Sequence, residues 1–336
     1  MHARRKYLSK EPERGEDKPQ EKYLSARYTT GEASESLGVS FITIKRWIYS
    51  GKIHAEKSSD GKWLISEEEI QRLRNQINTE TAEIDKKILD LISKKEVAYL
   101  RELQVCLEDE YLHKDTYAAL KRLVPSKLNS IYEWDSRWYF PKNKRWTDVV
   151  NVAKEKNELM KLYVDHPRRF EKDGVVYMDY SEFFVERALL QAGYTVVAKD
   201  TYYFNGIAYR LSNTAGRPTD LDFIAYSPEK KLYLGIQVKN KMEHPTHEEV
   251  SVLLEICNVL HLHPILIGRI IHPLTYTLLK NNKGRAVKYK RYFLQPPFPR
   301  DKFNKIIDMG IPIGVYKWCP EFLVKLLLDL KNQIIE

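Results

Sequence analysis

Residues 217–226 (RPTDLDFIAY) and, after a short turn, residues 234–240 (LGIQVKN) predict two adjacent β-strands. Side chains alternate between the two faces of a strand, so Gln237 and Lys239 share one face. The apolar residues between and before them, Leu234, Ile236 and Val238, then point the other way, into a core. The pattern therefore places carboxylates on one strand and an amide and a lysine on the next.

This combination suits hydrolysis of a phosphodiester. Carboxylates hold a divalent metal, the metal polarises the phosphate and activates water, and an ammonium group stabilises the developing charge. Asp220 and Asp222 are both candidates for the metal-binding aspartate. Asp220 lies on the same face as Asp222 if the strand extends that far. The alternative interpretation is that these residues are ordinary surface charges at strand ends.

An amphipathic helix precedes the two strands. Its run, residues 181–192, carries Glu182 and Glu186 and ends at Gly193, a residue typical of a helix C-terminus. A further strand is expected over residues 194–198. The order of glutamate helix, strand, aspartate strand and Gln-x-Lys strand resembles the PD-(D/E)XK nuclease superfamily, nearest its Mrr-like and archaeal Holliday-junction-resolvase-like branch. The resemblance covers about residues 175–290.

The resemblance implies a restriction-endonuclease-like α/β domain with a central mixed sheet over residues 174–336. In that branch a glutamate lies about three turns before a Gly-aromatic pair, a position that Glu182 matches and Glu186 misses by one turn. The metal-binding aspartate heads an apolar run, which favours Asp222 over Asp220. A helix over residues 246–261 and a buried strand over 264–269 then follow the lysine strand, as in the branch. A helix over residues 321–335 is expected to end the chain.

The resemblance also implies roles for these side chains. Glu182, Asp222 and Gln237 would hold Mg²⁺ or Mn²⁺, with Asp220 as an outer ligand, and Lys239 would orient water or steady the transition state. The superfamily usually places an acid where this chain has Gln237, although the Mrr-like branch often carries Gln-x-Lys. A neutral amide oxygen still ligates a hard cation, but with lower affinity.

The N-terminal region has the spacing of a helix-turn-helix. Thr30 and Ser40 are expected to cap two short helices, and Gly38 allows the tight turn between them. Inward-facing apolar residues on the second helix leave four others to point outward, which are Thr43, Lys45, Arg46 and Tyr49. The second helix of such a motif normally enters the DNA major groove, so these four are candidate DNA contacts.

A hairpin around Asp60-Gly61 follows, and it carries Lys57 and Lys62 as further candidate DNA contacts. Ser66 and Glu69 then form a capping box for a helix expected to end near Asn75. Residues 28–74 resemble the MerR/excisionase-type DNA-binding module, so a domain is assigned to residues 28–76. The alternative is a small helical domain used for protein contacts.

Residues 80–146 are predicted to form a winged-helix-like domain. Three apolar helical patterns are followed by a hairpin over residues 131–140, with its turn at Asp135-Ser136. Its third helix region carries positive charge, at Lys114, Lys121, Arg122 and Lys127. Because winged helices also serve as dimerisation or spacer modules, DNA contact is one of two interpretations. Residues 147–173 are interpreted as a charged helical connector, broken by His166-Pro167.

Composition and residue spacing indicate the kind of partner and exclude several kinds of site. The net charge of +9 favours a polyanionic partner, and the three widely spaced cysteines form no disulfide or metal pattern. No membrane span or signal peptide is recognisable, and residues 1–27 are interpreted as a charged, disordered leader. Five histidines lie near the lysine strand, at positions 244, 247, 261, 263 and 272. Their irregular spacing favours surface or structural roles over a zinc site.

The sequence therefore predicts an α/β multidomain protein in which helix-turn-helix modules target a metal-dependent DNA nuclease to DNA, in repair, recombination or restriction. A prokaryotic-like, cytoplasmic and nucleoid-associated setting fits this prediction. A homodimer, a helicase or another DNA-processing protein are compatible partners. The alternative is a DNA-binding regulator or recruiting platform whose nuclease fold has lost activity through the glutamine at position 237.

Overall fold

The computed structural model describes residues 26–166, 169–172, 175–209 and 220–334. The chain divides into two compact units, residues 1–82 and 83–336, and each is described by itself. Most of the predicted leader and the first three residues of the quoted strand, 217–219, lie outside the described residues. The leader was predicted too long, because Arg27 already belongs to strand β1.

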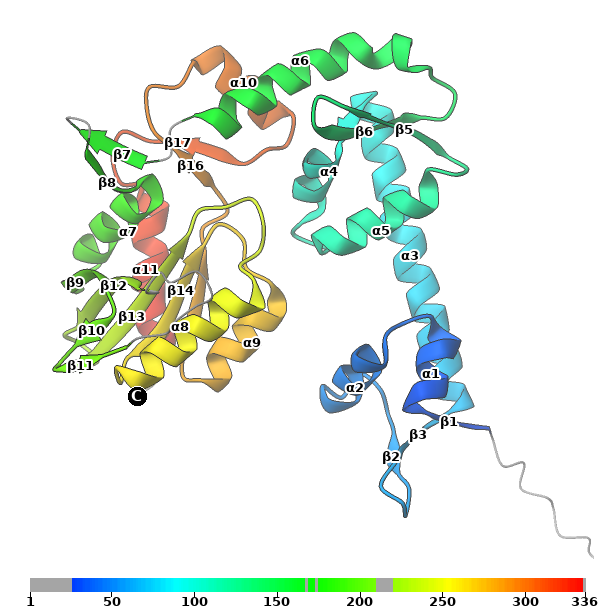
Figure 1. The fold of residues 1–336 in the computed structure, drawn as a ribbon, viewed down its shortest axis with the longest axis horizontal. Helices are drawn as coiled ribbons and strands as arrows, with labels where there is room; N and C mark the ends of the chain where they lie inside the picture. Colours follow the sequence, from blue (N-terminus) through cyan, green and yellow to red (C-terminus); the bar gives the residue numbers. More distant parts are fainter. Residues whose placement is uncertain (1–25, 167–168, 173–174, 210–219, 335–336) are drawn as a thin grey trace, which may run out of the picture. The chain divides into compact units, whose positions relative to one another are not determined.

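The first unit contains a helix-turn-helix (Figure 1). Its elements are β1 (Arg27–Thr29), α1 (Thr30–Leu37), α2 (Phe41–Tyr49), β2 (Glu56–Lys57), β3 (Trp63–Ser66) and the first part of α3 (Glu67–Lys95). Gly38 takes a positive φ of 64° at the turn, and Ser40 caps α2, as predicted. The cap of α1 is Thr29 rather than Thr30, because the Thr29 side chain accepts from the Glu32 backbone N–H.

Helix α3 is much longer than predicted. It continues for 29 residues to Lys95, whereas the sequence suggested an end near Asn75. The run contains no glycine or proline, and its buried apolar positions continue at helical spacing, as Ile70, Leu73, Ile84, Ile88 and Ile92. Nothing in the sequence therefore stops the helix, and the predicted division between residues 28–76 and 80–146 falls inside it.

The winged-helix prediction is matched by the elements after residue 83. The C-terminal part of α3 is followed by β4 (Ala98–Tyr99), α4 (Leu100–Leu107), α5 (His113–Leu123), β5 (Leu128–Glu133) and β6 (Ser136–Pro141). The sheet order is β4-β6-β5. The hairpin turn lies one residue earlier than predicted: Glu133 pairs with Ser136, so Trp134 and Asp135 occupy the turn, both with positive φ.

Helix α6 (Trp146–Asp165) was predicted as a connector, but one of its faces is buried. Val149, Ala153, Leu159 and Tyr163 join a core with the winged helix and with three C-terminal elements. These elements are β16 (Tyr292–Leu294), α10 (Arg300–Asp308) and β17 (Ile313–Val315). Past α6, the predicted connector also contributes a strand, because β7 (Arg169–Lys172) pairs with β8 (Val175–Asp179). The winged helix and the C-terminal region are thus one packed body.

A five-stranded mixed sheet forms the centre of the C-terminal region. Its strand order is β15 (Arg285–Lys288), β14 (His263–Gly268), β13 (Leu232–Lys239), β12 (Leu221–Ser227) and β9 (Thr195–Thr201). The strands β9, β12 and β13 are antiparallel, and β13, β14 and β15 are parallel. A small hairpin, β10 (Tyr203–Phe204) and β11 (Ile207–Ala208), follows β9.

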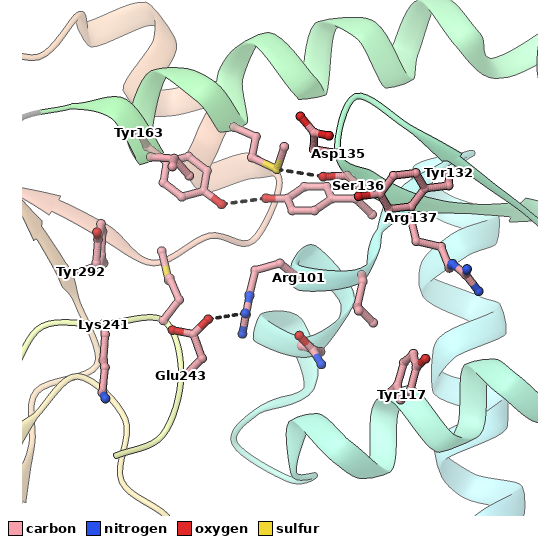
Figure 2. Close-up of a pocket in the computed structure, with 16 residues that line it drawn as sticks. Arg101, Tyr117, Tyr132, Asp135, Ser136, Arg137, Tyr163, Lys241, Glu243 and Tyr292 are labelled. Carbon is pink, nitrogen blue, oxygen red and sulfur yellow. Dashed lines mark hydrogen bonds and ion pairs between the residues drawn. The ribbon is translucent and has the colours of Figure 1, made fainter. Parts of the chain in front are cut away.

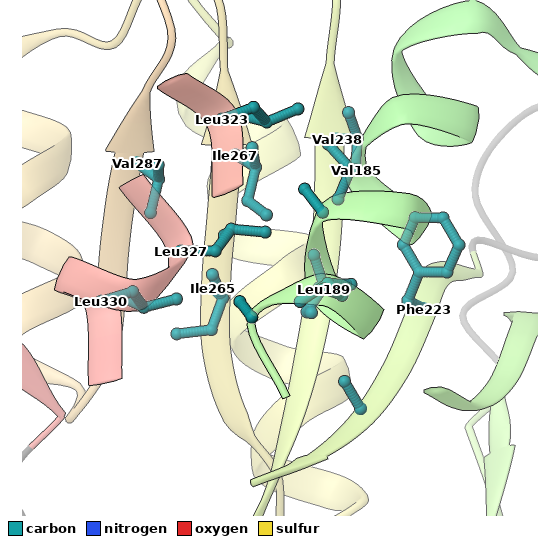
Figure 3. Close-up of a cluster of buried hydrophobic side chains, with 14 of the residues drawn as sticks. Val185, Leu189, Phe223, Val238, Ile265, Ile267, Val287, Leu323, Leu327 and Leu330 are labelled. Carbon is teal, nitrogen blue, oxygen red and sulfur yellow. The ribbon is translucent and has the colours of Figure 1, made fainter. Parts of the chain in front are cut away.

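Helices cover both faces of this sheet. Helices α7 (Tyr180–Gln191) and α11 (Glu321–Gln333) pack on one face, where Val185, Leu189 and Leu327 meet Ile265 and Ile267 of the sheet (Figure 3). Helices α8 (His247–Val259) and α9 (Pro273–Asn281) supply residues to the core on the other face. The predicted alternation of β13 is confirmed, because its residues at 234, 236 and 238 belong to the α7 and α11 core. A β-carbon at Gly235 would lie 2.4 Å from the Cys257 sulfur on α8, so β13 and α8 approach closely.

One buried ion pair joins the winged helix to the sheet. Arg269, which follows β14 and is fully buried, donates to both carboxylate oxygens of Glu108, at 2.6 and 2.9 Å. It also donates to the backbone carbonyls of Lys241 and Met242. Four of its five N–H groups are therefore hydrogen-bonded to acceptors from two parts of the unit.

We predict that Glu108→Ala lowers the free energy of unfolding by about 3–5 kcal/mol, because it leaves the Arg269 charge buried without a partner. Urea denaturation of the purified protein measures this loss. Asp109→Ala is the matched control, since its pairs with Lys288 and Lys290 are exposed and are expected to contribute about 1 kcal/mol or less. Equal effects of the two substitutions would contradict this account.

Candidate functional site

The pairing of β12 with β13 brings Asp222 and Gln237 together. Phe223 lies opposite Ile236, so the next pair along the two strands is Asp222 and Gln237. The Gln237 side-chain Nε2 donates to Asp222 Oδ1 at 2.8 Å. The Val238 backbone N–H donates to the other oxygen, Asp222 Oδ2. Both oxygens of this carboxylate are therefore held in place by β13.

Asp200 on β9 lies level with Asp222 in the register of β9 and β12. Leu221 lies opposite Thr201 and Phe223 opposite Lys199, which places Asp222 across from Asp200. This aspartate was not predicted as a site residue, because the strand was expected to end at residue 198, whereas β9 continues to Thr201. The signal that could have found it is the Lys-Asp pair directly after the apolar run of β9.

Asp220 lies immediately before β12, which begins at Leu221. The expectation that strand alternation places Asp220 with Asp222 therefore fails, because the strand does not extend that far. Asp220 nevertheless contributes negative charge to the site. After burial, it is the main cause that raises the pKa of Asp200, and it also raises the pKa of Asp222.

Helix α7 brings Glu182 to the same end of the sheet. Glu182 is the third residue of the helix, and its Oε2 accepts from the Asp179 backbone N–H at 3.1 Å in a capping box. Burial, followed by repulsion from Asp222, raises the pKa of Glu182 to about 8. Glu186 forms an ion pair with Lys199 at 2.5 Å instead. The structure thus places Glu182 within electrostatic reach of Asp222.

Burial raises the pKa of Asp222 to about 7, and the charge of Lys239 works in the opposite direction. Lys239 is half-buried on the face of β13 that also carries Gln237. The strand end is fixed by Asn240, whose side-chain amide exchanges two hydrogen bonds with the Phe293 backbone, each 3.0 Å long. Asn240 was not among the site residues predicted from the sequence.

The oxygen donors of this site suit a hard cation such as Mg²⁺ or Mn²⁺. Two carboxylates with raised pKa values, Glu182 and Asp222, would be stabilised in their charged forms by a nearby positive ion. Among the described residues, however, no three His, Cys, Asp or Glu side chains are grouped so that they could hold a metal. A cation here would therefore rely on two carboxylates and the Gln237 amide, which predicts weak binding.

Three histidines cluster elsewhere in the same unit. The ring of His244 lies 5.2 Å from that of His113 and 5.6 Å from that of His272, between centroids. Burial lowers the pKa of His244 to about 4, so its ring is neutral at physiological pH. Within the described residues, these three rings are not grouped so that they could hold a metal. His113 was not among the histidines considered from the sequence.

The recognition helix α2 exposes most of its predicted DNA contacts. Lys45, Arg46 and Tyr49 are exposed, and Tyr49 lies edge-on to Trp63. Thr43 is only half-buried rather than fully outward, and its hydroxyl lies 2.8 Å from that of the cap residue Ser40. Thr43 therefore has a local structural partner that competes with any DNA contact.

The wing carries the two other predicted contacts, and both are exposed. Lys62 forms an ion pair with Asp60 at 2.8 Å, and the Lys57 ammonium lies 5.5 Å from the centre of the Trp63 ring. Trp47 and Trp63 are partly buried and pack against the core. Arg46, by contrast, has no ion pair among the described residues, so its guanidinium is available to a phosphate or a base edge.

Comparison with known families finds a helix-turn-helix domain over residues 27–77. No curated protein and no solved structure matches the chain. Residues 27–77 thus form a DNA-binding helix-turn-helix domain, in agreement with the exposed basic residues of α2. Within the described residues, no helix is both long enough and apolar enough to cross a membrane.

We predict that Arg46→Ala weakens binding of duplex DNA by the full-length protein roughly five- to hundredfold, as expected when a free arginine contacts a phosphate or base. Fluorescence anisotropy at several salt concentrations measures both the affinity and its salt dependence. Lys86→Ala is the control, because Lys86 is an exposed cation on α3 outside the matched domain. An equal loss in both variants would show that only net charge matters.

Proposed function

We propose that residues 174–336 form a metal-dependent deoxyribonuclease that the N-terminal helix-turn-helix domain targets to DNA. The observation that carries this proposal is the convergence of Asp222, Gln237 and Lys239 at one end of β12 and β13, with Glu182 brought beside them by α7. These residues come from the elements, and in the chain order, that the resemblance to PD-(D/E)XK nucleases implies.

The sheet supports the same proposal. Strands β9, β12 and β13 form an antiparallel meander, and α8 then leads to the parallel strand β14. Helix α7 precedes this meander in the chain and packs on one face of the sheet, and α8 follows it and packs on the other face. This arrangement positions acids and lysine at the ends of neighbouring strands, where a phosphate can approach them.

Glu182, Asp222 and Gln237 are the residues that would hold Mg²⁺ or Mn²⁺, with the Asp220 and Asp200 charges nearby. When bound, such an ion supplies Lewis-acid activation of the phosphate and of water. Asp222 is suited to this role because two donors from β13 fix its carboxylate in one orientation. Its raised pKa reflects a negative charge that burial leaves poorly solvated.

Lys239 acts on the phosphate itself. Its half-buried ammonium lies near Asp222 and shares a strand face with Gln237, so it can stabilise negative charge that develops on the phosphate oxygens. The backbone around it is fixed, since the Tyr289 hydroxyl donates to the Lys239 carbonyl at 3.1 Å. A rigid backbone at the base of this side chain limits the reorganisation that is needed when charge develops on the phosphate.

The helix-turn-helix domain would raise the local DNA concentration at the nuclease site without altering its chemistry. The net charge of +9 favours association with DNA in the same way. Cleavage by a protein without residues 1–76 would then require much higher DNA concentrations.

A second candidate function is that of a DNA-binding regulator or recruiting platform with an inactive nuclease fold. The observation in its favour is the Gln237 amide, which donates to Asp222 and thereby occupies a carboxylate oxygen that a metal would use. The position of Lys239 favours the enzyme instead, because its half-buried side chain lies near Asp222 and shares the strand face of Gln237, where it could act on a bound phosphate.

We predict that Lys239→Ala lowers the cleavage rate by about 10²–10³-fold and leaves DNA affinity nearly unchanged, since binding rests on the helix-turn-helix domain. The assay uses labelled linear, nicked, branched and single-stranded DNA with Mg²⁺, with Mn²⁺ or with EDTA. Lys230→Ala is the control, because Lys230 lies at the turn end of the same β12–β13 hairpin.

Cleavage by the Lys239→Ala protein at the wild-type rate would remove this lysine from the mechanism. If the wild-type protein cuts none of the four DNA forms with either metal, the second candidate function replaces the first.

A further inference from the structure

A cleft of about 570 Å³ lies between the winged helix, α6 and the segment that follows β13 (Figure 2). Its volume is in the range of sites that hold small molecules or single nucleotides. Five tyrosines line it, namely Tyr99, Tyr117, Tyr132, Tyr163 and Tyr292. All of its walls belong to the unit of residues 83–336.

The β5–β6 hairpin presents one aromatic ring and one cation side by side on the wall of the cleft. Tyr132 and Arg137 are directly opposite each other in the hairpin, so their side chains leave the same face. Tyr132 is 63% exposed. Arg137 is exposed as well, and it forms no ion pair within the described part of the chain. Both groups are therefore free to contact a ligand.

The other charged groups of the cleft are largely neutralised. Arg101 pairs with Glu243, and Lys241 pairs with Glu249 at 2.6 Å. Asp135 is the remaining acid of the lining. The cleft is thus an aromatic site with one free cation rather than a strongly basic groove, which suits a ligand that has a flat ring and few charges.

The deep part of the cleft is rigid. The hydroxyls of Tyr99 and Tyr163 are hydrogen-bonded to each other at 2.8 Å, and both rings are buried. The Arg101–Glu243 pair joins α4 to the segment after β13 across the cleft, as Figure 2 shows. A ligand would therefore enter a cavity that is already formed, which lowers the entropic cost of binding.

The cleft is continuous in sequence with the candidate catalytic strand. Lys241 in its lining follows Lys239 by two residues, so their backbones are at most ~7 Å apart. The end of β13 therefore leads directly into the lining of the cleft.

We propose that this cleft binds an unpaired nucleotide of DNA, with its base stacked on Tyr132 and its phosphate paired with Arg137. Aromatic rings with a neighbouring cation are the general means by which proteins hold single-stranded nucleic acid, since every base offers a flat face. The consequence for cleavage rests on the proposed nuclease function: the preferred substrate is DNA that contains a single-stranded segment. Binding in the cleft does not depend on that function.

The test is equilibrium binding of a labelled oligothymidylate and of a blunt-ended linear duplex to the full-length protein in EDTA, where nothing is cut. Tyr132→Ala is expected to weaken oligothymidylate binding roughly five- to hundredfold. Tyr132→Phe should retain the affinity, because stacking needs the ring and not the hydroxyl. Arg137→Ala should lower the salt dependence for the single strand by about 0.7 in the log–log slope.

Two controls match these variants. Tyr203→Ala removes another exposed tyrosine outside the cleft, and Lys142→Ala removes another exposed cation just after the same hairpin. Neither should change oligothymidylate binding, and duplex binding should be the same in Tyr132→Ala as in wild type.

An unchanged oligothymidylate affinity in Tyr132→Ala would overturn the proposal, and so would an equal loss for single strand and duplex. Loss in Tyr132→Phe as large as in Tyr132→Ala would exclude stacking and would also overturn it. Because these measurements contain no metal, their failure is distinct from a failure of the nuclease proposal, which shows only in the cleavage assay.

Discussion

The register between β12 and β13 is the constraint on which the candidate site depends. It sets Asp222 opposite Gln237 and lets the Val238 backbone hold the second carboxylate oxygen. A shift by one residue would turn Asp222 into the core of α7 and α11 and bring Phe223 out. The apolar residues on the other face of β13 prevent that shift, because they are fully or almost fully buried. Packing on the face that α7 and α11 cover thus fixes the positions of Asp222 and Gln237 on the opposite face.

The site concentrates negative charge that the fold alone does not compensate. Glu182, Asp200 and Asp222 all have raised pKa values, and burial is the main cause in each. Each of these carboxyl groups has a higher pKa in the folded protein than in the unfolded chain, so the unfolded chain loses the proton at lower pH. The free energy of unfolding therefore decreases as pH rises through this range. A site that lowers stability in this way is characteristic of functional residues. A divalent cation bound beside these carboxylates would offset this loss of stability, and the positive charge of Lys239 already offsets part of it at Asp222.

Much of the organisation was predictable from local sequence signals. The alternation of apolar and polar residues located β13. Ser40, Gly38 and the Asp60-Gly61 turn located the helix-turn-helix, because each of these residues determines the backbone conformation at its own position. The order of elements around Glu182 and Asp222 also followed from short patterns. These features depend on a few adjacent residues, so one sequence is enough to reveal them.

Features set by distant contacts were missed. Asp200 enters the site only through pairing between β9 and β12, and Arg269 meets Glu108 from a position 161 residues away. The length of α3 was underestimated because a capping box marks where a helix begins, while its end depends on apolar residues that find partners further along the chain. The cleft beside β13 is likewise formed by segments that no local pattern connects.

The most direct test of the central claim is calorimetric titration of Mn²⁺ into the wild-type protein and into Gln237→Glu. If Asp222 and position 237 face a common cation, the added carboxylate tightens binding at a single site, since a hard divalent ion is held by the number of charged oxygens around it. The same isotherm for both proteins, or no binding to either, would contradict the account that this end of the sheet is a metal site.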